Sequence, residues 1–137
     1  MSKLFAWVHE PWAINAAQIF QYCAGMFAGF MAVLGTATPQ FLAGSLQPWL
    51  IATVGCLFIL GGAVGTFAVA KGNWGLERIS LWIVGVAFFA LLPAASYISF
   101  TGRSPAVWIV LILVLWALCD VFKRYRRIDW AYLDPAK

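Results

Sequence analysis

The chain has 137 residues, of which 64% are hydrophobic and only 10% are charged, whereas an ordinary soluble domain carries roughly 25% charged residues. A single core of this size cannot hide so much apolar surface from water. The composition therefore excludes an ordinary soluble domain and predicts an integral membrane protein.

Four segments are apolar and long enough to cross the hydrocarbon layer of a membrane, which takes about 20 residues of helix. They run over residues 13–35, 48–70, 77–100 and 105–122, separated by short stretches with Gly, Pro and Ser. We therefore expect an all-α fold, a single domain over residues 1–137 built as an integral membrane bundle of four transmembrane helices. The segment before residue 13 lacks the apolar centre and cleavage site of a signal peptide, and we expect it to lie in the membrane interface.

The first two spans carry small residues one helical turn apart, which let helices approach closely in a bilayer. In the first span, two glutamines continue the same side of the helix, and buried amides in lipid need partners. The residues expected at helix contacts are Gln18, Gln21, Gly25 and Gly29 in the first span and Gly61 and Gly65 in the second, with Gly55, Gly62 and Thr66 nearby. We expect these two spans to pair. Such a pattern most often packs one chain, and contact between copies is the alternative.

The stretch "GNWGLER" between the second and third spans contains Glu77 and Arg78 in an otherwise uncharged region. We interpret it as a short cytoplasmic turn at the water–lipid boundary. A carboxylate in the first turn of a helix interacts favourably with the helix dipole, and Arg78 is placed to reach a lipid phosphate.

The fourth span has bulky side chains all round and is expected to face lipid over most of its surface. Residues 123–137 form a basic tail with apolar residues at helical spacing, which favours a helix that leaves the bilayer and lies along it. We expect Asp120 to pair with Lys123 or Arg124 at this solvated edge. The basic residues predicted to contact lipid headgroups and to fix the topology are Arg78, Lys123, Arg124, Arg126 and Arg127.

The orientation follows from the basic residues, because cytoplasmic segments retain Lys and Arg. With both termini in the cytoplasm, all nine Lys and Arg residues except Arg103 fall on the cytoplasmic side. We therefore predict a protein integral to the cytoplasmic membrane, with its N-terminus and C-terminus inside.

The sequence lacks the residues that most membrane chemistry needs. Its single histidine, His9, precedes the first span, and its three cysteines, Cys23, Cys56 and Cys119, are far apart in apolar runs, as expected for small apolar fillers. No nucleotide-binding, zinc-binding or hydrolase motif appears. We expect neither an enzyme nor a bound metal or cofactor. The interleaved aromatic residues of the basic tail suit membrane lipids better than nucleic acid.

The stretches "EPWAINAAQ", "LGGAVGTFAVAKGNWGLERISL", "TGR" and "RRIDWAYLDP" together resemble the small four-span membrane proteins encoded by tailed phages of actinobacteria. These proteins are often found beside lysis genes and are frequently labelled holin. The resemblance covers most of the chain and implies no catalytic residues. It implies a protein made during phage infection, with holin activity as the most specific expectation. The methionine after Met1 is Met26, so the paired start codons that give some holins an inhibitor are missing.

Three hypotheses about function follow. The first is a holin-like protein that self-associates in the cytoplasmic membrane and permeabilises it for host lysis. The second is a non-catalytic accessory subunit of a larger membrane complex, or a phage superinfection-exclusion protein. The third, a small transporter or channel, is the weakest, because the spans hold no ionisable group of the kind that ion coupling needs.

Overall fold

Four helices make up the described part of the chain: α1 (Trp12–Val33), α3 (Pro48–Lys71), α4 (Trp74–Thr101) and α5 (Ala106–Leu133). The computed structural model describes residues 12–35, 47–102 and 106–133, and side chains within 15–35, 47–102 and 108–128. The described residues are all-helical apart from short turns, as the sequence predicts. The expectation for the N-terminal segment lies outside the described residues, as does the expectation for Arg103.

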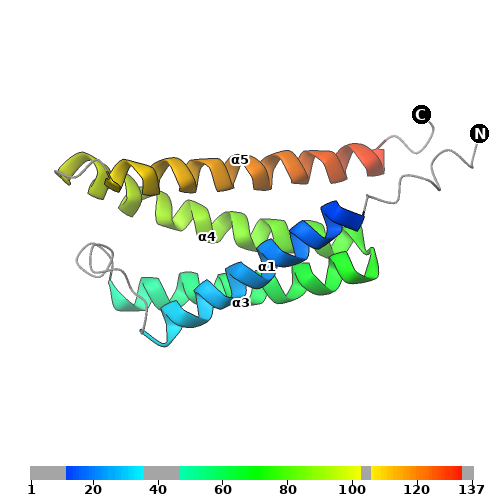
Figure 1. Ribbon diagram of the computed structural model, residues 1–137, viewed down its shortest axis with the longest axis horizontal. Coiled ribbons are helices and arrows are strands. Elements are labelled where there is room, and N and C mark those ends of the chain that lie inside the picture. The colour runs from blue at the N-terminus through cyan, green and yellow to red at the C-terminus, as the bar shows by residue number, and fades with distance from the viewer. Residues whose placement is uncertain (1–11, 36–46, 103–105, 134–137) are drawn as a thin grey trace, which may run out of the picture.

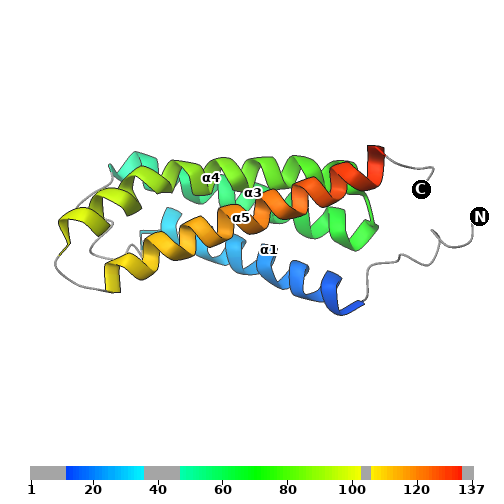
Figure 2. The same ribbon diagram turned by 90° about the horizontal axis from the view of Figure 1, so that it is seen from above.

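Each helix runs antiparallel to the next. The four long helices lie side by side and form an elongated bundle (Figure 1). The start of α1, the end of α3, the start of α4 and the end of α5 meet at one end, which we call the Lys71 end. The extensive contacts are between consecutive helices, α1 with α3, α3 with α4 and α4 with α5. A second view shows α5 crossing over α3 and α4 while α1 lies to one side (Figure 2).

A tight turn joins α3 to α4 and fixes their antiparallel packing. Gly72 has a φ of 65°, a left-handed conformation that costs residues with a side chain about 1–2 kcal/mol. The next residue, Asn73, caps α4 by accepting a hydrogen bond of 3.3 Å from the backbone N–H of Leu76. A short connection of this kind leaves the two helices no arrangement other than antiparallel neighbours.

The fourth helix differs from the sequence-based expectation. The basic tail from residue 123 was predicted to be a helix that leaves the bilayer and lies along it, whereas in the structure residues 123–133 continue α5 without a break to Leu133. The reason is local: residues 106–133 contain neither Gly nor Pro, and Lys and Arg are good helix formers. Residues 134–137 of the predicted tail lie outside the described residues.

Three of the described helical segments are long and apolar enough to cross a membrane: Asn15–Val33, Pro48–Lys71 and Trp74–Thr101. Large apolar side chains point outward, with Phe20 74% exposed, Phe100 76% and Trp116 70%. A soluble protein rarely exposes so many large apolar residues, whereas a lipid environment favours them. The protein is therefore a helical membrane protein.

One cluster of buried apolar side chains lies at the Lys71 end. It consists of one buried residue from each helix, Tyr22 of α1, Val69 of α3, Leu81 of α4 and Ile128 of α5. Residues far apart in the chain therefore meet at this end, next to the polar side chains described below.

Candidate functional site

Glycines bring α1 and α3 into close contact. A Cβ atom added at Gly29 would lie 2.5 Å from the carbonyl oxygen of Gly55, and one added at Gly62 would lie 2.7 Å from the carbonyl oxygen of Tyr22. Both distances are too short for any side chain. The predicted pairing of these two helices is therefore present, but the α3 residues that face the α1 backbone are Gly55 and Gly62.

The other predicted contact glycines differ in their neighbours. Gly61 faces α4, since an added Cβ would lie 2.6 Å from Val84. Gly65 lies beneath the ring of Tyr22 and beside the hydroxyl of Ser80, both 2.5 Å from such a Cβ. Gly25 is open, with only Phe58 at 3.9 Å. The spacing of Gly61 and Gly65 makes them equivalent in the sequence. In the structure α3 packs against two helices, so Gly61 faces α4 alone, whereas Gly65 contacts both α1 and α4.

An ion pair joins α4 to α5 at the Lys71 end. Arg124 donates to the carboxylate of Glu77, and only 13% and 5% of their side chains are exposed. Arg124 was predicted to bind lipid headgroups or to pair with Asp120. The structure turns it inward, because α5 continues as a helix and brings Arg124 opposite the first turn of α4.

Arg78 also makes contacts within the chain that differ from the prediction of lipid-phosphate binding. Its guanidinium donates to the hydroxyl of Tyr125 at 3.0 Å and 2.5 Å and lies 4.8 Å from the centre of that ring, within cation–π range. The remaining predicted headgroup residues, Lys123, Arg126 and Arg127, are exposed on α5.

Next to the ion pair, α1 contributes two buried polar side chains. Gln18 is 8% exposed and Tyr22 is 7% exposed. The Oε1 atom of Gln18 and the hydroxyl of Tyr22 have no partner with hydrogen-bond geometry. Ser80, Glu77 and Arg124 are nevertheless close enough to the Tyr22 hydroxyl to influence it. Ser80 instead donates to the carbonyl oxygen of Gly61 at 2.5 Å.

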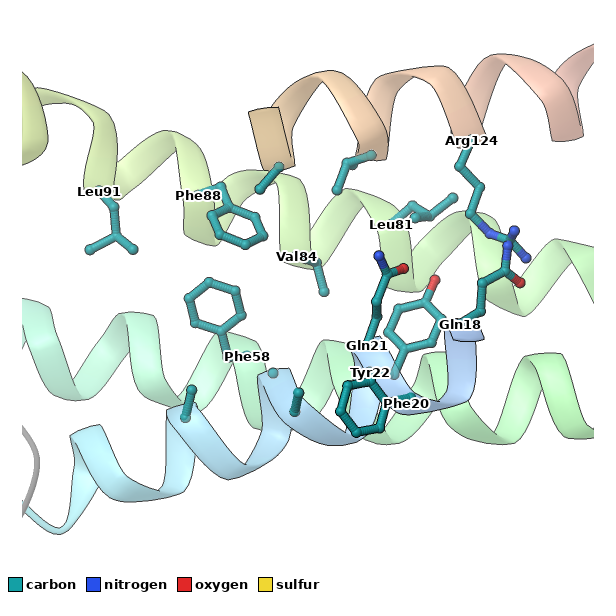
Figure 3. Close-up of a pocket in the computed structure, with 16 residues that line it drawn as sticks. Gln18, Phe20, Gln21, Tyr22, Phe58, Leu81, Val84, Phe88, Leu91 and Arg124 are labelled. Carbon is teal, nitrogen blue, oxygen red and sulfur yellow. The ribbon is translucent and has the colours of Figure 1, made fainter. Parts of the chain in front are cut away.

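These side chains border a cavity of about 500 Å³ that is lined by residues of all four described helices. Figure 3 shows Gln18, Tyr22 and Arg124 gathered at one end, while Phe58, Phe88 and Leu91 lie at the other. Three α1 residues at the rim, Gln21, Ala24 and Ala28, are exposed. The cavity is therefore amphipathic, and it is open to the surroundings beside α1.

The sequence pattern identified part of this site. It predicted that Gln18 faces protein, and Gln18 is buried. Gln21 lines the cavity but remains exposed. Tyr22 was not singled out, although it follows Gln18 by four residues and therefore shares its face of the helix. The polar face of α1 could have included Tyr22 on that spacing alone.

The chain matches no family model, no curated protein and no solved structure. Within residues 15–35, 47–102 and 108–128, no group of three or more His, Cys, Asp or Glu side chains is placed to hold a metal ion.

Proposed function

We propose that this protein crosses the cytoplasmic membrane four times, with the Lys71 end in the cytoplasm. The antiparallel helices gather Lys71, Arg78, Lys123, Arg126 and Arg127 at that end, as the retention of basic residues in the cytoplasm favours. The helix α5 has 28 residues and is about 42 Å long at 1.5 Å per residue. It is therefore long enough for a hydrocarbon layer of about 30 Å.

We further propose a holin-like function, in which copies of the chain associate in the membrane and permeabilise it. The observation that carries this proposal is the order of packing. The extensive helix contacts are all between consecutive helices. Away from the cluster at the Lys71 end, α1 and α5 therefore each have one extensive neighbour, and they form the two edges of the bundle. Both edges present large apolar side chains, such as Phe27 at 67% exposure and Trp116 at 70%.

The two edges differ, so contact between the α1 edge of one copy and the α5 edge of the next would be heterologous. Heterologous contacts form rings when the rotation closes and open arrays when it does not. Either assembly is suited to making a membrane lesion, and no catalytic residue is required.

Cysteine cross-linking tests this assembly. In a variant with Cys23, Cys56 and Cys119 replaced by alanine, the pair Phe27→Cys and Trp116→Cys should give a ladder of disulfide-linked copies in membranes. The matched control replaces Phe27→Cys by Leu60→Cys, which is 58% exposed on α3 and belongs to neither edge. An equal ladder from both pairs would contradict edge-to-edge assembly.

The lytic activity is tested separately. Induced expression in bacteria, followed with a membrane-potential dye, should give a delayed and abrupt loss of potential. Continued growth and a steady potential at high expression would contradict the holin-like proposal.

One observation favours a second candidate, a non-catalytic accessory subunit of a larger membrane complex or a superinfection-exclusion protein. Gly29, Gly55 and Gly62 are used in contacts within the chain, so they are not free for contacts between copies. Such a protein would remain monomeric in the cross-linking experiment. It would also leave the membrane potential unchanged.

A further inference from the structure

We propose that the cavity binds one single-chain amphiphile of the bilayer, with a small uncharged head that carries hydroxyl groups, as in a monoacylglycerol. The first argument comes from Gln18 and Tyr22. Their polar atoms line the cavity, are more than nine-tenths buried and lack hydrogen-bond partners. Buried polar groups are usually satisfied, so a ligand with polar atoms at this end would complete the site.

The charges at this end select the head of the ligand. Arg124 reaches the cavity, but Glu77 already neutralises it through the ion pair. An anionic or cationic head would therefore add an unbalanced charge in a region shielded from water.

A hydroxyl group both donates and accepts hydrogen bonds. It can donate to Gln18 Oε1, and it can accept from the hydroxyl of Tyr22. If the side-chain amide of Gln18 is turned by 180°, its Nε2 atom takes the place of Oε1. The ligand hydroxyl can then accept a hydrogen bond from Nε2. A head with two hydroxyl groups therefore suits the site in either orientation.

The rest of the cavity selects an apolar chain. Phe58 and Phe88 meet edge to face with ring centres 4.9 Å apart, and Val84 and Leu91 continue the apolar wall (Figure 3). A volume of about 500 Å³ lies within the usual range of roughly 300–1,000 Å³ for small-molecule sites. The exposed rim beside α1 lets such a molecule enter sideways from the membrane, without its head crossing to water.

The test uses the purified full-length protein in detergent micelles and measures binding by native mass spectrometry. The probe is 1-monooleoylglycerol, compared with oleate, which has the same chain and a charged head, and with octadecane, which has no head. We expect one bound monooleoylglycerol per chain, with at least tenfold weaker binding of both comparison molecules.

Two kinds of variant locate the binding. Gln18→Leu and Tyr22→Phe should each weaken monooleoylglycerol binding at least tenfold. Thr53→Val is the control for loss of a hydroxyl, because Thr53 is exposed on α3 and bonds only within its own helix. Ala28→Phe adds bulk at the exposed rim and should block binding without requiring any buried group to move.

The proposal is overturned if monooleoylglycerol does not bind, if octadecane or oleate binds equally well, or if folded Gln18→Leu and Ala28→Phe both bind like the wild type. A helix of a second copy is the other possible occupant of the opening. In that case Ala28→Phe would abolish dimers in the mass spectrum while no glyceride is bound, which would also overturn the proposal.

Discussion

The ion pair between Glu77 and Arg124 joins two helices in a buried position and therefore constrains how α4 and α5 pack. Removing one partner of a buried pair leaves a charge without its counter-charge and costs about 3–5 kcal/mol. We therefore expect Arg124→Met to lower the free energy of unfolding by that amount, measured by circular dichroism during denaturant unfolding in micelles.

Two controls separate the ion pair from a general effect of charge. Lys123→Met removes an exposed cation at the neighbouring position and should change the stability by no more than about 0.5 kcal/mol. The double variant Glu77→Leu/Arg124→Met should regain most of the lost stability, since replacing a whole buried pair by apolar residues is often neutral. If Arg124→Met and Lys123→Met are equally mild, the pair does not stabilise the bundle.

This pair also shows which residue contacts sequence reasoning can reach. Glu77 and Arg124 are 47 positions apart, and nothing in their local sequence links them. Asp120 stood four positions from Arg124 and was the natural partner by helical spacing. The true partner depends on how α4 and α5 face each other, which is a tertiary property. Gln18 could be assigned to a protein-facing side because its own helix already defines that side.

At the scale of the helices, the closest approach of α1 and α3 yields a prediction with an internal control. A Cβ at Gly29 would collide with the backbone of Gly55, which cannot rotate away, whereas a Cβ at Gly25 would meet only Phe58 at an ordinary distance of 3.9 Å. We expect Gly29→Ala to force the helices apart and to cost about 1–3 kcal/mol.

Gly25→Ala should leave the stability nearly unchanged or raise it slightly, because alanine favours the helix over glycine. Thermal unfolding of both variants in the same micelles gives the comparison. Equal destabilisation by the two substitutions would mean that the contact between α1 and α3 in solution is not the one described.

The helices themselves were largely predictable. The predicted spans 13–35, 48–70 and 77–100 agree with α1, α3 and α4 to within a few residues, since long apolar runs between Gly and Pro leave little choice in a membrane. The end of α5 was not predictable, because the change from apolar to basic residues marks a change of solvent and does not require a break in the helix. Gly29 and Gly65 do face the expected neighbouring span, but the contact of Gly61 with α4 and the open position of Gly25 were missed for a similar reason. A small residue permits close approach, but the sequence does not say to which neighbour.

At the scale of the whole molecule, one experiment can determine both the orientation of the protein and the number of times that it crosses the membrane. The Lys71 end carries the exposed basic residues, and Thr101 marks the opposite end of α4. If α5 crosses the membrane, the C-terminus returns to the side of the Lys71 end. If α5 instead lies on the surface, the C-terminus stays on the side of Thr101.

Single cysteines in the cysteine-free variant distinguish these cases. We expect Thr101→Cys to react with a membrane-impermeant maleimide in intact cells, and Lys137→Cys to react only after the membrane is opened. Labelling of both positions in intact cells would show that α5 does not cross. Labelling of Lys137→Cys alone would reverse the orientation, place the basic residues outside, and contradict the charge bias that orients most membrane helices. Only the expected pattern is compatible with four crossings and a cytoplasmic Lys71 end.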